Sequence, residues 1–381
     1  MKILLVNTLY YPYRIGGAEV SVQLLAEELA ARGHFVRVLT LHEGKERKVS
    51  IVNNVEVVYL PLVNLYWPFS NDEKSKIKKI FWHLLDNYNP FMARMVAKEL
   101  SIYSPDIVHT NNISGFSVSI WREVKKINIR LVHTSRDYYL FHPSTTLFKG
   151  NDNISKKSLS VKIWSCVKKI ASKHVDSFIG ISDFIRDYHK ESGFFKKATF
   201  GTIYNAVRVD ETVVLNECPE QKKIGYIGRL SRDKGFDNFC NFIISLRKRS
   251  HIFAVSAGRY SNDKDSKILF ELASSAQIEH LGFVDINYFL SKVDVVVLPI
   301  KWREPFGRVV IECALAGKVV VTSPVGGITE LMSIMPNIVD MNSFKIEDTL
   351  ISLSKVEQIR FSEFFSESTM AERYLSVYFV L

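Results

Sequence analysis

The stretch MKILLVNTLYYPYRIGGAEVSVQLLAEELAARGHFVRVLT, residues 1–40, decides the fold class. Its apolar run at residues 3–6 suits a buried parallel strand. A loop with two glycines follows, and the next segment places apolar residues on one helical face: Val20, Leu24, Leu25 and Leu29. Gly33 stands where a helix commonly ends, and residues 35–39 form a second apolar run. This strand–helix–strand unit predicts a parallel sheet covered by helices.

The same rhythm continues along the chain and restarts once. The first series adds strand candidates at residues 55–60, 107–109, 129–133 and 177–181. The second series begins after Asn205, at residues 222–228, 251–258, 278–283, 294–299 and 318–323. We therefore predict two α/β domains, residues 1–200 and 206–360, with a boundary near 199–209. Because such sheets bind ligands beyond the carboxyl ends of their strands, the default site is a cleft between two facing domains.

Composition fits a globular protein of two domains. The 381 residues are 47% hydrophobic and 24% charged, and a domain usually takes roughly 100–200 residues. The cysteines, Cys166, Cys218, Cys240 and Cys313, lack metal-like spacing and fit a reducing compartment. The first apolar run is too short for a signal peptide, and no stretch approaches the roughly 20 apolar residues of a membrane span. We expect a cytoplasmic protein that does not cross a membrane.

The net charge of +10 predicts an anionic partner. A phosphorylated ligand, anionic lipid head groups and nucleic acid would all satisfy it. Charge alone does not choose among them, but no recognised nucleic-acid motif is present. We therefore expect no nucleic-acid partner.

The strongest chemical signal is EPFGRVVIE, residues 304–312, directly after the strand DVVVLP. Pro305 disfavours helix at Glu304, so a helix beginning near Gly307 would present free N–H groups to an anion. Glu312 lies two turns into this apolar helix, where a carboxylate needs a polar partner such as sugar or ribose hydroxyls. The alternative is a loop glutamate followed by a salt-bridged helix glutamate.

A second signal is GRLSRDKG, residues 228–235, after the strand IGYI. Arg229 offers a planar fork for phosphate oxygens and Lys234 offers a point charge, while Gly228 lets backbone approach a ligand. The alternative is a solvated basic turn. Its place after a strand of the second series favours a binding role.

Three weaker signals each keep a structural alternative. Gly16 and Gly17, between the first strand and helix, allow an N–H group to approach a diphosphate, although they do not form GxGxxG. His133 ends the strand IRLVH and is a site candidate or a structural histidine. Residues 326–327, in VGGITEL, form either a phosphate cradle or a turn before a helix.

Together these motifs resemble retaining glycosyltransferases of family 4, the group 1 transferases with two Rossmann-like domains known as the GT-B architecture. The resemblance covers nearly the whole chain and rests on the following segments: GGAE at 16–19, His133, IYNAV at 203–207, GRLSRDKG, EPFG to Glu312, and VGGITEL. It implies that a final helix, about residues 361–381, packs back on the first domain. It also implies transfer of a sugar from a UDP- or GDP-linked donor.

The resemblance assigns roles residue by residue. Arg229 and Lys234 would hold the donor diphosphate, and Glu304 would bind hydroxyls of its sugar. Glu312 would bind ribose, and His133 would lie near the transferred sugar. The remaining donor-binding positions are Gly16, Gly17, Gly228, Phe306, Gly307 and Arg308. Many relatives carry an acidic residue close behind the strand-end histidine, whereas here the nearest is Asp137, to which we assign no role.

Retention of anomeric configuration follows from the resemblance, with front-face attack assisted by the donor phosphate. No protein nucleophile, cofactor or metal is expected. Residues 263–265, Asp-Lys-Asp, have the appearance of a metal-binding DxD motif but lie in a polar stretch that favours an exposed loop.

The acceptor is expected to be a saccharide or a polyprenyl-diphosphate-linked sugar in bacterial surface polysaccharide biosynthesis, including lipopolysaccharide. Two basic amphipathic stretches, residues 74–85 and 156–174, suit an anionic membrane surface, the second with Ile163, Val167 and Ile170 on one face. Such binding would place the protein peripherally on the inner face of the cytoplasmic membrane. The alternative is a pair of core-packed helices with solvated basic faces.

Three other functions remain open. A nicotinamide-dependent dehydrogenase suits two Rossmann-like domains but lacks GxGxxG. A nucleotide-sugar epimerase would act without an acceptor. A non-enzymatic sugar-nucleotide-binding protein would not consume its ligand.

Overall fold

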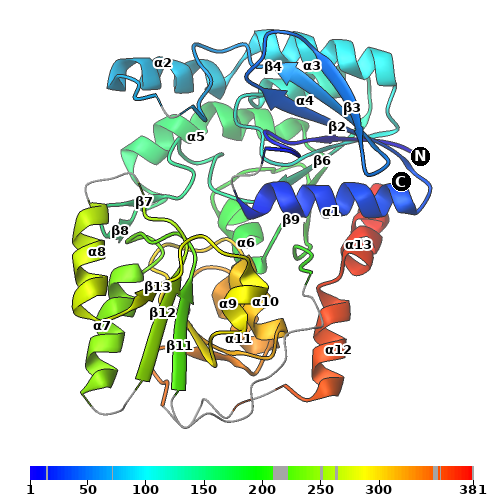
Figure 1. Cartoon of the computed structure of the whole chain (residues 1–381). Coiled ribbons are helices and arrows are strands. Elements are labelled where there is room, and N and C mark those ends of the chain that lie inside the picture. Colours follow the sequence, from blue (N-terminus) through cyan, green and yellow to red (C-terminus); the bar gives the residue numbers. More distant parts are fainter. Residues whose placement is uncertain are drawn as a thin grey trace. The chain divides into compact units, whose positions relative to one another are not determined.

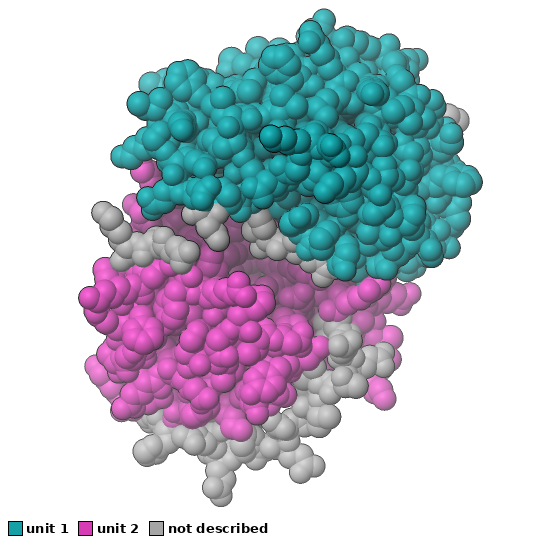
Figure 2. Space-filling view, turned by 45° about the horizontal axis from the view of Figure 1, so that its top comes forward, with its two compact units in different colours: residues 1–147, 155–206, 367–381 teal, residues 148–154, 207–366 magenta. Residues whose placement is uncertain are grey.

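A computed structural model describes residues 1–13, 16–70, 72–208, 222–248, 252–261, 265–345, 351 and 353–379. The chain forms two compact units (Figure 2). Unit 1 comprises Met1–Leu147, Ser155–Ala206 and Glu367–Leu381, and unit 2 comprises Phe148–Ile154 and Val207–Ser366. Each unit contains its own parallel sheet, which confirms the α/β class with two Rossmann-like domains.

Unit 1 contains an eight-stranded sheet in the order β10-β9-β6-β5-β1-β2-β4-β3. Its strands are β1 (Lys2–Val6), β2 (Phe35–His42), β3 (Lys48–Val52), β4 (Val55–Pro61), β5 (Ile107–Thr110), β6 (Arg130–Ser135), β9 (Ser177–Gly180) and β10 (Thr199–Thr202). Strand β3 pairs antiparallel at one edge, and the other pairs are parallel. The strand order reverses between β1 and β5, which is where sheets of this type bind ligands.

The helices of unit 1 cover this sheet (Figure 1). They are α1 (Gly17–Ala31), α2 (Lys76–Asn87), α3 (Pro90–Tyr103), α4 (Ser119–Lys126), α5 (Leu159–Ala171), the short 3₁₀ helix η1 (Ser172–His174), α6 (Asp183–Glu191) and α13 (Glu367–Phe379). Helix α13 lies beside α1 (Figure 1). Its Met370, Ala371 and Tyr374 belong to the same apolar core as Ile3 and Leu25. Burial of this face holds the end of the chain on unit 1.

Unit 2 contains a six-stranded parallel sheet in the order β13-β12-β11-β14-β15-β16. The strands are β11 (Lys222–Ile227), β12 (Ile252–Ala257), β13 (Glu279–His280), β14 (Val295–Leu298), β15 (Val319–Thr322) and β16 (Ile338–Asp340). The helices are α7 (Phe236–Arg247), α8 (Asp265–Ser275), α9 (Ile286–Leu290), α10 (Arg308–Leu315), α11 (Ile328–Ile334) and α12 (Lys355–Phe364). The apolar run of β14 is buried throughout, as expected for a central parallel strand.

Two details differ from the expectation. The expected single terminal helix is in fact two helices, α12 and α13. Helix α12 is followed by its C-cap residue Phe365. The Phe365 side chain is buried in unit 2, and its carbonyl accepts a hydrogen bond from Val207 N. A small hairpin, β7 (Phe148–Lys149) and β8 (Asp152–Asn153), lies in unit 2 although its position in sequence assigned it to the first domain. None of the helices in the described ranges is long and apolar enough to span a membrane.

Candidate functional site

Two loops meet at the switch point of the unit 2 sheet. Strands β11 and β14 are neighbours at the position where the strand order reverses. The loop after β11 contains residues 228–235, and the loop after β14 contains residues 299–307. Both leave from carboxyl strand ends, so their side chains converge at the edge where such sheets bind ligands.

The first loop is held tightly against the second. The Tyr226 hydroxyl donates to the carbonyl of Arg229 at 2.9 Å, and the carbonyl of Lys234 lies 3.3 Å from the same hydroxyl. Gly235 has φ +77°, and a Cβ there would lie 1.7 Å from the carbonyl oxygen of Pro299. Only glycine permits this close approach. The backbone of Asp233 accepts hydrogen bonds from residues 301 and 302, which joins the loops a second time.

The predicted cations and carboxylates come together in this site. Lys234 Nζ lies 2.6 Å from Glu304 Oε2, and Trp302 Nε1 donates to the same oxygen at 2.9 Å. The Lys234 ammonium also lies 4.8 Å from the centre of the Trp302 ring. Arg229 pairs with Asp233 at 2.7 Å and keeps half of its side chain exposed. The structure therefore places Arg229, Lys234 and Glu304 on adjoining loops of one unit.

Helix α10 begins as the sequence predicts. Gly307 is its N-cap residue with φ +93°, and the side chain of Phe306 is buried, so these two residues face the site through backbone. Arg308 donates to Glu312 Oε1 at 2.7 Å. Burial nevertheless raises the pKa of the Glu312 carboxyl, because removal from water penalises the charged form. Glu312 is thus a salt-bridged helix glutamate whose carboxylate a ligand hydroxyl would further stabilise.

The glycines of VGGITEL fix the backbone of Glu304. Gly327 N donates to the Glu304 carbonyl at 2.7 Å. Gly326 has φ +60°, and a Cβ there would lie 2.3 Å from the same carbonyl oxygen. Of the two alternatives, the structure shows a turn before α11 that supports the glutamate.

Asn153 and Trp302 are contributors that sequence reasoning missed. The Asn153 amide on β8 donates to the carbonyl of Lys301 at 2.9 Å and accepts from Arg303 N at 3.0 Å. It therefore supports the loop that carries Glu304, 151 positions further along the chain. A lone asparagine in a polar hairpin gives no sequence signal for such a contact. Trp302 stands two residues before Glu304, and its indole N–H group could have been recognised as a hydrogen-bond donor to that carboxylate.

Of the DxD-like motif, the structure describes Asp265 alone. Asp263 and Lys264 lie outside the described residues. Asp265 begins α8 and pairs with Arg232 Nε at 3.2 Å.

In unit 1, Gly16 and Gly17 begin α1 at the carboxyl end of β1. Both are exposed, and Gly16 N donates to Glu19 Oε2 at 2.9 Å in a capping box. That N–H group is therefore occupied, while Gly17 opens the helix. Their approach to a diphosphate stays a prediction.

His133 is a core residue of unit 1. Its side chain is 2% exposed, with Nδ1 2.9 Å from Thr110 Oγ1 and Nε2 3.3 Å from Ser135 Oγ. The ring stacks on Phe195 and meets the edge of Trp121. Burial holds its pKa well below the ordinary value. Enclosed in this way, the ring fits the structural alternative, and its expected catalytic role stays a prediction.

Arg136, three residues further on, is the polar group that reaches the strand-end edge. Its guanidinium is buried and donates to Asn111 Oδ1 at 3.0 and 3.1 Å and to Asn205 Oδ1. It forms no salt bridge with a carboxylate of the described residues. Within the described residues, the buried Asn111 Nδ2 has no hydrogen-bond partner. Asp137 follows, and burial raises the pKa of its carboxyl to about 6. The polar residues directly after the β6 strand were the signal for this cluster.

Two largely parallel sheets of Rossmann-like order, one with paired cations and carboxylates at its switch point, are the features expected of a GT-B transferase. Comparison with protein families agrees. Residues 15–211 match the family described as Glycosyltransferase Family 4, and residues 221–344 match Glycosyl transferases group 1. The chain therefore belongs to glycosyltransferase family 4 and is a glycosyltransferase.

Curated relatives extend the match. An uncharacterized 42.6 kDa protein in the cps region of Klebsiella pneumoniae is 46% identical over 378 residues, covering 99% of this chain and all of the relative. An uncharacterized glycosyltransferase of Methanocaldococcus jannaschii is 24% identical over 357 residues, covering 87% of this chain and 83% of the relative.

Solved structures share the fold. Sucrose-phosphate synthase from Thermosynechococcus elongatus superposes with a TM-score of 0.73 at 17% identity, covering 99% of this chain and 98% of the other. The Anabaena protein HepE, solved in complex with UDP, superposes with a TM-score of 0.69 at 18% identity over the full length of both chains. At this identity the likeness shows the fold alone.

Proposed function

We propose that this glycosyltransferase moves a sugar, with retention of configuration, from a UDP- or GDP-linked donor to a saccharide or polyprenyl-diphosphate-linked acceptor. The observation that carries the proposal is the Lys234–Glu304 pair with Arg229 at the switch point of unit 2. A nucleotide sugar presents a diphosphate beside sugar hydroxyls. The site offers cations for the first and a carboxylate for the second.

The donor diphosphate would bind Arg229 and Lys234. Among the described residues Arg229 pairs with Asp233 in a partly exposed setting, where an ion pair contributes little and is readily exchanged. A diphosphate carries more charge than that carboxylate and accepts the guanidinium fork in the same way. As the glycosidic bond breaks, negative charge gathers on the diphosphate, and both cations are already positioned to stabilise it.

The two carboxylates would select the sugar and the nucleoside. Glu304 shares its Oε2 between Lys234 and Trp302, so the group is oriented before a sugar hydroxyl arrives. Glu312 is held by Arg308 through Oε1, which orients its carboxylate toward ribose hydroxyls. Gly228 and the backbone amides of Phe306 and Gly307, directly before α10, complete the proposed donor contacts.

The proposed reaction is front-face attack with the donor phosphate assisting removal of the acceptor proton. It uses no protein nucleophile, and it invokes no metal or cofactor because the cations and helix amides supply the required charge. Exclusion of water during transfer would limit hydrolysis of the donor.

The comparisons support the biological setting. The Klebsiella relative lies in a cps region, which favours surface polysaccharide biosynthesis, and HepE was solved with UDP, which favours a uridine donor. Polyprenyl-linked acceptors reside in the membrane. The proposal therefore includes peripheral attachment to the inner face of the cytoplasmic membrane.

The test is thermal unfolding of the purified protein with UDP, GDP, ADP, TDP or NAD. A ligand that binds the folded state raises its stability by RT ln(1 + [L]/Kd). We expect one nucleoside diphosphate to raise the midpoint, and Arg229→Ala to abolish that shift. Arg232→Ala is the matched control, because Arg232 lies in the same loop but pairs with Asp237 and Asp265.

A response to NAD alone would contradict the proposal in favour of a dehydrogenase. Once the nucleotide is known, the corresponding nucleotide sugar separates the remaining alternatives. Isomerisation without acceptor would identify an epimerase, and binding without turnover in the presence of membrane extract would identify a binding protein.

A further inference from the structure

Helix α5 turns its apolar face outward. Its buried side consists of Val161, Ser165, Lys168 and Ala171. The opposite side carries Leu159, Ile163 and Ile170 at 73%, 61% and 61% exposure, with Val167 at 37%. These residues repeat at helical spacing over about 17 Å at 1.5 Å per residue. A helix that packs on a core normally shows the reverse arrangement.

Helix α2, which packs against α5, repeats this feature. It buries Trp82 and Asp86, and the His83 ring lies 6.1 Å from that of Trp164 on α5. Leu85 is partly buried, and four other large apolar side chains are more than half exposed: Ile77, Ile80, Phe81 and Leu84. Both helices therefore expose apolar side chains beside their lysines, which the alternative of core-packed helices with solvated basic faces does not predict. Exposed apolar residues of this extent mark an interaction surface.

The charge on these two helices is positive. Helix α2 contributes exposed Lys76, Lys78 and Lys79, and its one acidic residue, Asp86, is buried. Helix α5 contains no acidic residue and contributes exposed Lys162. Such a face repels a second copy of itself and attracts an anionic partner.

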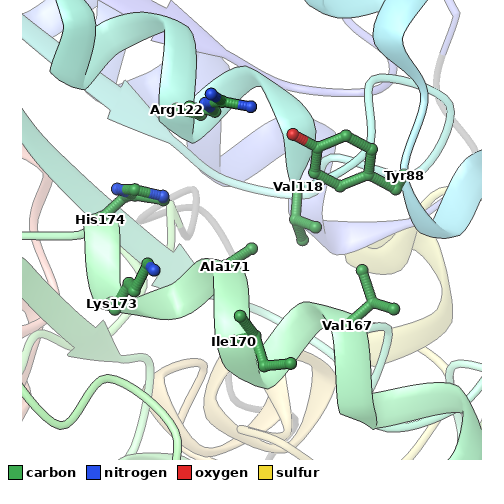
Figure 3. A pocket seen from close by; sticks show the side chains of 8 residues that line it. All are labelled: Tyr88, Val118, Arg122, Val167, Ile170, Ala171, Lys173 and His174. Carbon is green, nitrogen blue, oxygen red and sulfur yellow. The ribbon is translucent and has the colours of Figure 1, made fainter.

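A cavity of about 450 Å³ opens beside the apolar residues of α5. Figure 3 shows Arg122, Lys173 and His174 on one side and Val167 with Tyr88 on the other. Burial lowers the pKa of His174, and four neighbouring cations, Lys173 and Arg122 among them, lower it further. The cavity thus offers cations for an anionic head and apolar walls for what is attached to it.

We propose that the exposed face of α2 and α5 docks unit 1 on an anionic lipid bilayer, with a lipid phosphate held between Arg122 and Lys173. We call this surface the α2–α5 face, defined by Ile77, Ile80, Phe81, Leu84, Leu159, Ile163, Val167 and Ile170. Apolar residues in the interface plane with flanking lysines are the features of interfacial helices. The docking gives the proposed function a specific surface, yet it follows from the exposed groups alone and does not require transfer activity.

The test is co-sedimentation of the full chain with vesicles of phosphatidylcholine alone or mixed with phosphatidylglycerol. We expect binding to the anionic vesicles that weakens as salt rises. The double variant Ile163→Glu/Ile170→Glu should lose at least about tenfold in partition coefficient, because each change places a carboxylate in the interface. Phe35→Glu is the matched control, since Phe35 is 70% exposed at the start of β2 and should leave binding unchanged.

A second pair of variants isolates the cavity. Arg122→Ala/Lys173→Ala should reduce binding to anionic vesicles more than Lys45→Ala/Lys48→Ala, which removes the same charge from an exposed part of the β2–β3 region. Equal losses would overturn the proposed phosphate site, because general electrostatic attraction would then explain the binding.

Three outcomes would overturn docking by this face: no binding of the wild-type protein at low salt, equal binding of the Ile163→Glu/Ile170→Glu variant, or a wild-type dimer that this variant dissociates. Circular dichroism and the nucleotide-induced thermal shift should match wild type in every variant. Failure of docking would thus leave the donor site intact, and failure of the donor site would leave docking intact.

Discussion

Unit 2 pairs the cations of its strand-end loops with carboxylates, whereas unit 1 holds Arg136 at the equivalent sheet edge with amide oxygens. Lys234 meets Glu304 and Arg229 meets Asp233 in a partly exposed setting. Arg136 is buried, and its described hydrogen bonds go to Asn111 and Asn205. A paired, accessible cation can exchange its partner for a ligand at low cost. A further hydrogen bond with Tyr374 and the Glu19 carboxylate favour the charged form of Arg136, but a buried cation without a direct ion pair still costs stability unless a ligand compensates it.

The difference assigns different tasks to the two edges. The unit 2 edge suits a ligand that is already negatively charged and gains further negative charge during the reaction. A donor diphosphate does so when the glycosidic bond breaks. The unit 1 edge holds one fixed positive charge in a desolvated position, where its interaction with a bound group is strong. We expect removal of either cation to lower the rate of sugar transfer.

The largest effect is expected from Lys234→Ala. Loss of one preorganised charge that stabilises the departing diphosphate costs about 10²- to 10³-fold in kcat. The measurement is the initial rate of sugar transfer from the donor identified by thermal shift, with Arg232→Ala as the control at wild-type rate. A Lys234→Ala rate within a few-fold of wild type would show that the diphosphate lies elsewhere.

Arg136→Met tests the unit 1 edge. We expect transfer to fall by about tenfold or more, the factor that corresponds to 1.4 kcal/mol. The free energy of unfolding should change by less than about 2 kcal/mol, since apolar replacement of a buried charge offsets part of the lost hydrogen bonding. Chemical denaturation and transfer rate are measured together.

Arg37→Met is the matched control for Arg136→Met. Arg37 is also buried in unit 1, but it pairs with Glu56 at 2.8 Å and lies 3.9 Å from Glu99. Its removal leaves the partly exposed Glu56 without its ion pair, whereas the buried Glu99 keeps Arg47 at 2.6 Å. We expect a loss of about 1–3 kcal/mol in the free energy of unfolding, with the activity of the folded fraction spared. If both variants lose stability equally and neither affects transfer, the comparison between the two edges fails.

Asn153→Ala sharpens the account of the unit 2 edge. It removes the two hydrogen bonds that hold residues 301 and 303, each worth about 1 kcal/mol. The loop that carries Glu304 should loosen, and nucleotide affinity should fall by up to about tenfold in a calorimetric titration. An unchanged dissociation constant would mean that the hairpin does not position the site.

The smallest effect concerns pH. Burial raises the pKa of Glu312, so its carboxylate becomes protonated at a higher pH than an ordinary glutamate. Binding that needs the ionised form is complete above this pKa and weakens as pH falls through it. Glu312→Gln should bind nucleotide more weakly at neutral pH and show a flatter profile in acid. A wild-type profile in the variant would remove Glu312 from the site.

Much of the fold was readable because each buried strand is an apolar run. Residues 3–6 and 294–299 could be assigned without knowledge of their neighbours. The hairpin at 148–154 could not, since it has no apolar pattern and joins unit 2 through Asn153. Long-range side-chain contacts of that kind leave no periodic signal.

The candidate site was readable where chemistry and position coincide. Arg229, Lys234 and Glu304 follow central strands, so their convergence follows from topology. The sequence pointed to His133 and not to Arg136, because which residue at the end of β6 points into the core depends on packing. Periodicity likewise identified the apolar face of α5, but it did not show whether that face points toward the core or toward solvent. Helical spacing is the same in both cases.

The most direct test of the central claim is a crystal structure of the protein with the nucleoside diphosphate that stabilises it most. We predict its phosphates within hydrogen-bonding distance of Lys234 Nζ and the Arg229 guanidinium, with its ribose against Glu312. A nucleotide bound to unit 1 alone, with the Lys234–Glu304 and Arg229–Asp233 pairs unchanged, would contradict the assignment of unit 2 as the donor site.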